Sequence, residues 1–357
     1  MFSNRAARVR DIGVRSAIFT RGFMTALSLL GAIGTALVYG LGGLFAINGT
    51  FSVGELASMG LLVGRIYMPL TGLTNARIDV LTALVSFDRV FEVLDAPSPL
   101  TDAPDAVALT NPQGKVEFRN VSFRYPRSNE LILKNINLTI KPGDLVAVVG
   151  PSGAGKTTLT SLIPRLYDVT DGELLVDGHD VRSLTQDSLR EAIGVVVQDP
   201  HLFHESIGDN LRYAKPGATE AEMIDVCRAA QILEVIEQLP SGFDTVVGER
   251  GYRMSGGEKQ RLSIARMLLK DPAMVILDEA TSHLDSENEA MVQQALATAL
   301  AGRSAVVIAH RLSTITQADQ ILVLDEGRLV QHGTHNELLA TGGLYADLYH
   351  RLVRDES

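Results

Sequence analysis

Apolar residues dominate the first ninety positions of the chain, and a long stretch of them is free of charge. No charged residue occurs between Arg21 and Glu55. The stretch 23–47 is apolar or small almost throughout, which is long enough for a helix to cross the core of a bilayer. A second apolar run covers 56–73 and contains Arg65, so it predicts a weaker span. The pattern therefore predicts two transmembrane helices joined by a short loop.

The later part of the chain has a different pattern. From 75 to 94, apolar residues recur at helical spacing among charged ones, which predicts that the second helix continues into the cytoplasm. The stretch 95–115 contains four prolines and is predicted to be a linker. From 116 to 352, strand-like apolar runs alternate with helical segments, including a helical insertion around 219–239. This alternation predicts an α/β domain.

Arginines set the expected orientation of the membrane segment. Residues 1–94 carry eight arginines, no lysine and five acidic residues. Apart from Arg65, the arginines precede the first span and return after the second, and the loop 48–54 has none. Both ends are therefore expected to face the cytoplasm. A secretory signal peptide is a rival interpretation, but the apolar run is too long for one.

The overall charge and the single cysteine narrow the classes of function. The formal net charge is −10, and because the first 94 residues are net basic, the acidic excess lies in the α/β domain. A nucleic-acid-binding surface would have the opposite sign, so no nucleic-acid partner is expected. The lone Cys227 excludes an internal disulfide and suits a reducing compartment, although a small buried residue is the plainer explanation.

A glycine-rich segment is the first candidate for chemistry. The apolar stretch 144–149 predicts a buried strand, and the residues after Gly155 predict a helix. The segment between them fits a phosphate-binding loop, in which glycines let backbone N–H groups face the phosphates. Lys156 is expected to reach the terminal phosphates and Thr157 to hold magnesium. The candidate nucleotide-binding residues of the loop are Gly150, Pro151, Ser152, Gly153, Ala154, Gly155, Lys156, Thr157 and Thr158.

An acidic pair follows a second predicted strand, 274–278. Phosphoryl transfer needs a carboxylate that binds the metal and a group that orients or deprotonates water. We therefore expect Asp278 to hold magnesium and Glu279 to act on the attacking water. Taken alone, such a pair is more often a solvated strand end. The assignment depends on the phosphate-binding loop that precedes it.

The segment Met254-Ser-Gly-Gly-Glu-Lys-Gln-Arg261 resembles the signature motif of ABC (ATP-binding cassette) proteins. A serine and two glycines at a helix start also form an anion-binding N-terminus. The resemblance extends over about 15–352. It implies an α/β P-loop NTPase cassette with a mixed sheet and a helical subdomain, preceded by transmembrane helices, with ATP and Mg²⁺ as cofactors. It further implies that Ser255, Gly256 and Gly257 cap ATP held by a second half-transporter in a head-to-tail dimer.

Further positions resemble family residues. Tyr125 resembles the aromatic that stacks on adenine, Gln198 the glutamine that reaches magnesium or water, and His310 the histidine that contacts the terminal phosphate. An ordinary strand tyrosine or strand-end histidine is the alternative. The stretch 282–285 resembles a loop that crosses the dimer interface, where His283 replaces a small residue. The implied catalytic residues are Lys156, Gln198, Glu279 and His310, and the implied metal ligands are Thr157, Gln198 and Asp278.

The segment 245–251 resembles one that, in ABC exporters, contacts the intracellular loops of the opposite subunit. Together with the fused membrane segment, it implies an exporter half-transporter that lies in membrane lipid, with its cassette in the cytoplasm, and moves an unidentified substrate. Such halves have six spans, so we expect this chain to be part of a longer protein through truncation, a late start codon or a split gene. A remnant or regulator that binds ATP without transport is the alternative. A soluble nucleic-acid-associated ATPase is disfavoured by the apolar run and the acidic charge.

Overall fold

The structure is a computed structural model, and it divides into two compact units, Met1–Ser98 and Pro99–Ser357. It describes residues 2–96, 100–126, 128–248, 251–278, 286–309 and 311–355. The predicted catalytic residues Glu279 and His310, and the predicted interface loop 282–285, lie outside these ranges.

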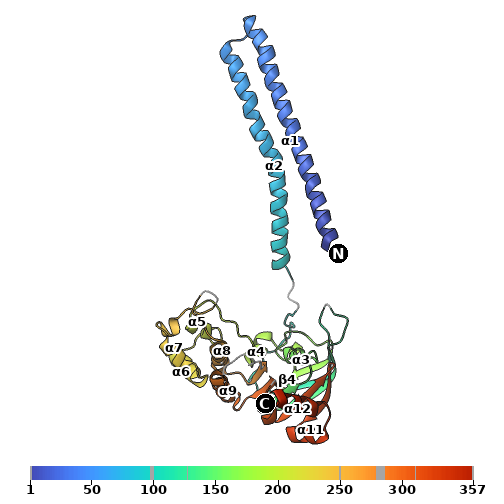
Figure 1. Cartoon of the computed structure of the whole chain (residues 1–357), viewed down its shortest axis with the longest axis vertical. Helices are drawn as coiled ribbons and strands as arrows, with labels where there is room; N and C mark the ends of the chain where they lie inside the picture. Colours follow the sequence, from blue (N-terminus) through green and yellow to red (C-terminus); the bar gives the residue numbers. More distant parts are fainter. Residues whose placement is uncertain are drawn as a thin grey trace. The chain divides into compact units, whose positions relative to one another are not determined.

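The first unit is a hairpin of two long helices that lie side by side, α1 (Phe2–Ile47) and α2 (Val53–Leu94) (Figure 1). Ser52 caps the start of α2. Its hydroxyl accepts a hydrogen bond from the Glu55 N–H at 3.3 Å, and the Glu55 carboxylate accepts one from the Ser52 N–H at 2.7 Å. This reciprocal pair satisfies backbone donors that a helix N-terminus leaves open.

One stretch of helix among the described residues, Gly13–Ile47, is long and apolar enough to cross a membrane. Large apolar side chains such as Leu29, Leu30 and Leu37 are exposed on it. The first predicted span, 23–47, lies within this stretch. The second predicted span, 56–73, lies within α2 and stays a prediction.

The second unit is an α/β cassette built on two sheets. Its strands are β1 (Val116–Phe123), β2 (Leu133–Ile140), β3 (Leu145–Val149), β4 (Asp171–Val176), β5 (His179–Asp180), β6 (Ile193–Val196), β7 (Met274–Asp278), β8 (Ser304–Ile308), β9 (Gln320–Asp325) and β10 (Arg328–Gly333). Its α-helices are α3 (Lys156–Leu162), α4 (Gln186–Glu191), α5 (Ile207–Arg212), α6 (Glu220–Ala229), α7 (Leu233–Gln238), α8 (Gly256–Lys270), α9 (Ser286–Leu300), α10 (Leu312–Gln317), α11 (His335–Thr341) and α12 (Leu344–Asp355). Two short 3₁₀ helices are η1 (Val181–Ser183) and η2 (Gly242–Asp244).

The larger sheet is mixed. Its strand order is β10-β9-β3-β8-β7-β6, and neighbouring strands are parallel except for the antiparallel pair β9–β10. The smaller sheet, in the order β2-β1-β4-β5, is antiparallel. The parallel strands of the larger sheet share one carboxyl edge. The loops that follow β3, β6, β7 and β8 therefore begin side by side, and such an edge is where ligands bind in open α/β sheets.

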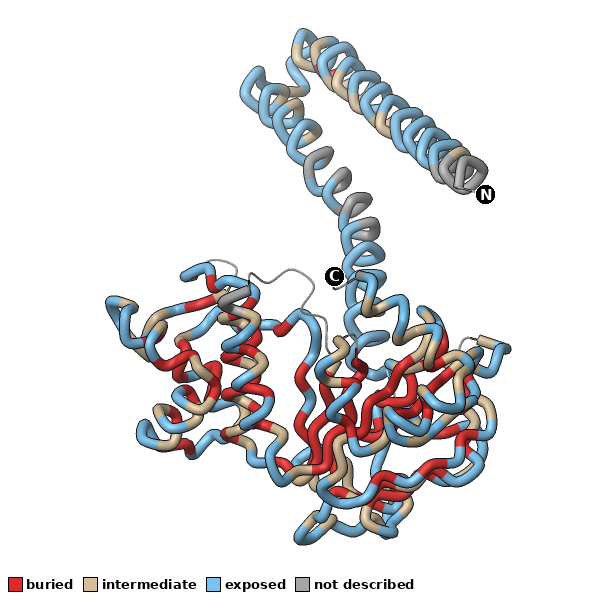
Figure 2. Tube along the Cα trace, turned by 60° about the horizontal axis from the view of Figure 1, so that its bottom comes forward, coloured by how far each residue is buried: buried red, intermediate tan, exposed pale blue. Residues whose placement is uncertain are grey.

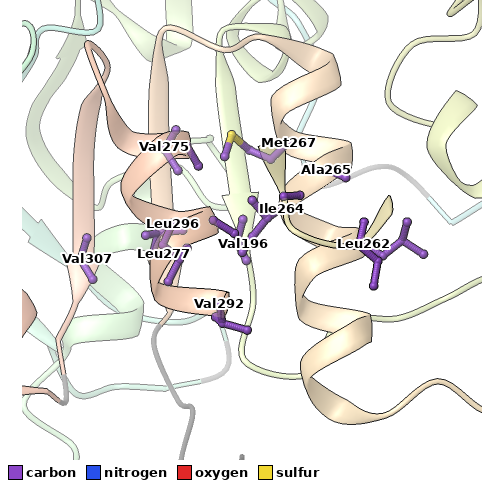
Figure 3. Close-up of a cluster of buried hydrophobic side chains, with 14 of the residues drawn as sticks. Val196, Leu262, Ile264, Ala265, Met267, Val275, Leu277, Val292, Leu296 and Val307 are labelled. Carbon is purple, nitrogen blue, oxygen red and sulfur yellow. The ribbon is translucent and has the colours of Figure 1, made fainter. Parts of the chain in front are cut away.

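Hydrophobic residues cover both faces of the larger sheet because successive strand residues point to opposite sides. Val146 and Val148 of β3 join one buried cluster with residues of β1, β2, β4 and α3, whereas Ala147 and Val149 join the other. In that other cluster, side chains of α8 and α9 pack on β6, β7 and β8 (Figure 3). Buried segments are concentrated in the cassette, and the two long helices are mostly exposed (Figure 2).

A helical subdomain lies between β6 and β7. It contains α5 to α8, and α6 and α7 fall within the stretch 219–239 where a helical insertion is predicted. Thr219 caps α6, with Glu222 completing the reciprocal pair of hydrogen bonds. The predicted fold class, an α/β cassette preceded by helices, is confirmed.

Candidate functional site

The predicted phosphate-binding loop, 150–158, connects β3 to α3, which begins at Lys156. The structure requires glycine at two of its positions. A Cβ at Gly150 would collide with the Leu324 carbonyl oxygen. Gly155 has a φ of 101°, in the left-handed region, and a Cβ there would lie 2.9 Å from the Leu133 side chain. These glycines let the chain turn sharply from strand to helix.

The Lys156 side chain lies back over this loop. Its Nζ donates to the carbonyl oxygens of Gly150 at 2.8 Å and Pro151 at 2.9 Å. Burial lowers the pKa of the Lys156 ammonium, and the Asp278 carboxylate raises it in part. An incoming phosphate would supply a fully charged acceptor in place of two carbonyl dipoles.

A cavity of about 660 Å³ opens at the carboxyl edge of the larger sheet. Its volume is in the range of small-molecule sites. It brings together predicted residues that lie up to 153 positions apart, from Tyr125 to Asp278. Lys156, Gln198 and Asp278 meet because β3, β6 and β7 end at this same edge, whereas Tyr125 follows β1 of the smaller sheet. It is lined by Tyr125, Ile132, Gly150, Ser152, Gly153, Gly155, Lys156, Thr157, Thr158, Gln198, Asp278 and Ile308.

The three predicted metal ligands all line this cavity. Thr157 is exposed on the first turn of α3, Asp278 is half-buried at the end of β7, and Gln198 is exposed in the loop after β6. A hydroxyl, a carboxylate and a side-chain amide offer oxygen atoms, which are the donors that Mg²⁺ prefers. The residues present therefore fit a magnesium ion.

Tyr125 stands at one wall of the cavity. Its hydroxyl is hydrogen-bonded to that of Thr158 at 3.0 Å. Its ring meets Phe123 and Tyr167 edge-on, with centroids 5.0 and 5.1 Å away. These contacts fix the ring beside the phosphate-binding loop.

Comparison with known proteins identifies this arrangement. Residues 133–282, which include the loop and β7, match the family model described as ABC transporter. This part of the chain belongs to the ABC transporter family.

Two curated relatives align along almost the whole chain. An ATP-dependent lipid A-core flippase of Syntrophus aciditrophicus (strain SB) is 42% identical over 355 residues, covering 99% of this chain and 59% of the relative. The ABC transporter ATP-binding protein YfiC of Bacillus subtilis (strain 168) is 39% identical over 348 residues, covering 98% and 58%. The chain thus spans about three fifths of the length of these curated relatives.

A solved structure is similar as well. It is described as a bacterial Atm1-family ABC exporter with ATP bound, and it is 38% identical to this chain with a TM-score of 0.73. The match covers 94% of this chain and 58% of that one. The similarity is therefore not confined to the cassette.

The residues that resemble the ABC signature are not among the described residues that line the cavity. Ser255 caps α8: its hydroxyl accepts from the Glu258 N–H at 3.3 Å, and the Glu258 carboxylate accepts from the Ser255 N–H at 2.7 Å. Gly256 is exposed and Gly257 is buried. The Glu258 side chain thus completes the cap.

Two other predicted loop residues do not line the cavity. Ala154 is buried, and its N–H donates to the Pro151 carbonyl oxygen at 3.2 Å, so this pair shapes the turn from inside. Of the exporter-like segment 245–251, all but Glu249 and Arg250 are described. Within it, Val247 is fully buried and its N–H donates to a carbonyl oxygen before α5 at 2.9 Å.

Sequence reasoning missed part of the cavity wall. Ile132 and Ile308 line it, and Tyr167 supports Tyr125 from behind. Ile132 reaches this position because its N–H donates to the Phe123 carbonyl oxygen at 2.8 Å, which sets the approach to β2. No local motif marks these apolar residues, although Ile308 lies two positions before His310, the predicted contact to the terminal phosphate.

Proposed function

We propose that the chain is the ATP-binding and ATP-hydrolysing subunit of an ABC exporter, in which cassette pairing driven by ATP moves a substrate out across the membrane. The observation that carries the proposal is one cavity lined by Lys156, Thr157, Gln198 and Asp278. They bring an ammonium group and metal-binding oxygen atoms together at the N-terminus of a helix. Phosphoryl transfer from a nucleotide needs this arrangement. The similarity to an ABC exporter solved with ATP supports it.

Each part of the nucleotide has a proposed contact. The Tyr125 ring stacks on adenine, the loop N–H groups receive the phosphates, and Lys156 reaches the terminal phosphate. Thr157 and Asp278 hold magnesium, with Gln198 near it. When bound, Mg²⁺ neutralises charge on the transferring phosphate. Glu279 then orients and deprotonates the attacking water, and His310 contacts the terminal phosphate.

The proposed partner is a second half-transporter, joined head to tail. Ser255 and its two glycines do not line the cavity of their own chain, which supports a role at the nucleotide of another cassette. The helix start at Ser255 offers N–H groups to an anion. Each nucleotide would then be enclosed by the loop of one chain and the signature motif of the other.

The proposed location is the cell membrane, crossed more than once, with the cassette in the cytoplasm. The apolar stretch Gly13–Ile47 and the arginines that flank the two runs support it. A relative named as a lipid A-core flippase supports an amphipathic, lipid-like substrate.

The test is ATP hydrolysis by the purified chain with magnesium. We expect slow turnover, and we expect Glu279→Gln to reduce it at least a hundredfold, because a general base contributes on that order. The same variant should still retain ATP in a filter-binding assay. Glu237→Gln, which changes an exposed carboxylate on α7, is the matched control and should hydrolyse like the parent. Turnover by Glu279→Gln equal to that of the parent would refute the assigned role.

A further inference from the structure

The cassette unit begins with an extended segment that is hydrogen-bonded to its surface. Residues 100–115 form no helix or strand in the described structure, but 100–109 lie against η1 and α4. The Val107 N–H donates to the Ser183 carbonyl oxygen and the Thr185 N–H donates to that of Val107, both at 2.9 Å. The Leu109 N–H donates to a side chain of α4 at 2.9 Å. We call residues 100–109 the docked segment.

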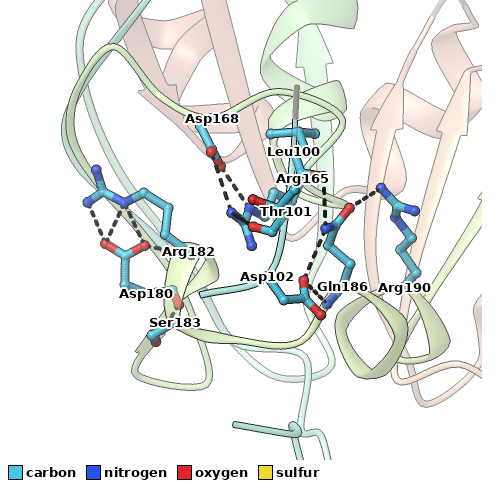
Figure 4. Close-up of polar contacts among 10 residues, drawn as sticks. All are labelled: Leu100, Thr101, Asp102, Arg165, Asp168, Asp180, Arg182, Ser183, Gln186 and Arg190. Carbon is cyan, nitrogen blue, oxygen red and sulfur yellow. Dashed lines mark hydrogen bonds and ion pairs between the residues drawn. The ribbon is translucent and has the colours of Figure 1, made fainter. Parts of the chain in front are cut away.

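Side chains hold the start of the docked segment (Figure 4). Asp102 Oδ1 accepts from the Gln186 backbone N–H at 3.1 Å and from the Gln186 side-chain amide at 3.0 Å. The same amide donates to the Leu100 carbonyl oxygen at 3.4 Å, and Arg190 donates to the Gln186 Oε1 at 2.9 Å. The bonds from Gln186 hold the pKa of the Asp102 carboxyl below its usual value, which favours its charged form.

A buried arginine adds a second attachment. Arg165 lies three residues beyond the end of α3, and its side chain is only 4% exposed. Its Nε donates to Asp168 at 2.8 Å, and its Nη2 donates to the Thr101 carbonyl oxygen at 3.3 Å. Its Nη1 is buried without a hydrogen-bond partner in the described part of the chain. Undocking would take another acceptor from a buried cation that is already short of one, which is unfavourable.

The elements that hold the docked segment also carry residues of the ATP site. Lys156 is the first residue of α3, and Arg165 follows its other end. The helix α4 leads through β6 to Gln198. The docked segment is therefore hydrogen-bonded to Arg165, just after α3, and to α4, and these two elements lead to Lys156 and Gln198 of the cavity.

Docking also limits the length of chain between α2 and the first described contact with the cassette. α2 ends at Leu94, and the first residue of the docked segment with a described hydrogen bond to the cassette is Leu100, so five positions separate the two. Five residues reach at most about 17 Å. Release of the docked segment would free the chain as far as Pro112, because the N–H groups of 113–115 donate to Asp177, and this longer stretch would reach about 60 Å. A displacement of the cassette is transmitted through a short connection and is lost in a long one.

We propose that Asp102, Arg165 and Gln186 form a linker clamp that fixes the mechanical length between α2 and the cassette, so that movements of α3 and β6 pull on α2 through the main chain. The movements of α3 and β6 in this proposal rest on the proposed ATPase function. The clamp itself rests on the hydrogen bonds within the cassette. Arg165, Asp102 and Gln186 are positioning residues, since none of them lines the cavity.

The variants are chosen so that the cassette stays folded. Asp102→Ala removes two hydrogen bonds at an exposed position, whereas changing the buried Arg165 endangers the fold. Asp102→Asn keeps a side-chain oxygen that accepts both bonds. Asp105→Ala is the matched control, because it removes, from the same segment, an exposed carboxylate that forms no hydrogen bond among the described residues.

Two measurements on the full chain in detergent test the clamp. The first is hydrogen exchange of the amides of 100–109. The second is the width of the distance distribution between spin labels at Val93→Cys and Lys141→Cys, two exposed positions on α2 and the cassette. We expect exchange in Asp102→Ala to be faster by on the order of tenfold, from the loss of two hydrogen bonds, and its distance distribution to broaden. The parent, Asp102→Asn and Asp105→Ala should agree in both measurements.

Equal exchange and equal widths in Asp102→Ala and the parent would overturn the clamp. Asp102→Asn behaving like Asp102→Ala would overturn its assignment to these hydrogen bonds. Titration with a fluorescent ATP analogue separates this inference from the proposed function, because all variants should bind ATP like the parent. A parent that fails to bind ATP would refute the ATPase proposal, while the two clamp measurements would still decide the clamp.

Discussion

At the scale of single residues, the cavity is lined by an aromatic ring, Tyr125, which we call the aromatic wall, and by two charged groups, Lys156 and Asp278, which we call the charged floor. Tyr125 contacts Phe123 and Tyr167, while Lys156 and Asp278 both line the cavity, from the start of α3 and the end of β7. The aromatic wall offers a flat apolar face, and the floor offers charge. A purine nucleotide has the same division between base and phosphates.

The ring of Tyr125 should therefore matter more than its hydroxyl. We expect Tyr125→Ala to weaken ATP binding by about tenfold or more, since stacking of a base on an aromatic ring contributes about 1–3 kcal/mol. Tyr125→Phe loses the bond to Thr158 but keeps the ring, so its affinity should stay close to that of the parent. Titration with a fluorescent ATP analogue measures both. Phenylalanine and alanine variants that are equally weak would show that the hydroxyl, not the ring, carries the contact.

Residues with a local motif could be predicted from the sequence, and residues placed by pairing could not. Lys156 and Thr157 follow from the glycine pattern around them. Ile132 enters the cavity wall through its backbone bond to Phe123, and Arg165 reaches Thr101 from 64 positions away. Such contacts depend on strand pairing and on long-range docking, which leave no pattern in a short window of sequence.

At the scale of elements, apolar runs predicted the buried strands well. β3 and β7 are continuous apolar runs because helices or a second sheet cover both of their faces. The stretch 95–115 is different. Its prolines predict that it forms no helix or strand, but they do not predict the partners of its backbone hydrogen bonds. Several of its described residues, among them Val107 and Leu109, form hydrogen bonds with the cassette, and the role of the stretch as a linker stays a prediction.

A buried cysteine on α6 can report the unfolding of the helical subdomain. Cys227 is fully buried on it, and burial raises the pKa of its thiol to about 12. Because the thiolate is the reactive form, we expect Cys227 in the native chain to react with a maleimide far more slowly than a free thiol.

Labelling should begin with urea unfolding of the helical subdomain, followed by mass spectrometry. Asp225→Cys, at an exposed position on the same helix, is the control and should label at once without urea. Native-state labelling of Cys227 at the rate of this control would contradict the packing of α6 against α8.

At the scale of the whole molecule, the hairpin of α1 and α2 and the cassette are separate compact units. The sequence predicts this division because the composition changes sharply from apolar and arginine-rich to acidic α/β. The residues of one chain alone do not predict that a nucleotide lies between two cassettes. This arrangement is implied by the family resemblance, and the absence of Ser255 from the described residues that line the cavity supports it.

In the proposed function, this cavity is half of an ATP site, and the signature motif of a second chain completes it. Two variants separate the halves. Lys156→Ala disables the phosphate-binding loop. Ser255→Asp keeps a good helix cap but places a negative charge where the partner's phosphates are expected, so it should disable the signature motif without unfolding α8.

Co-expressing the two variants with different tags, and purifying through both tags, yields mixed dimers for measurement of magnesium-dependent ATP hydrolysis. Parent chains carrying the same two tags provide the reference and establish that the chain pairs with itself. If the motif acts on the partner's nucleotide, each mixed dimer has one intact site and one with both defects, so we expect about half of the reference activity. Each variant alone should be inactive. Mixed dimers as inactive as the single variants, beside an active reference, would contradict the account.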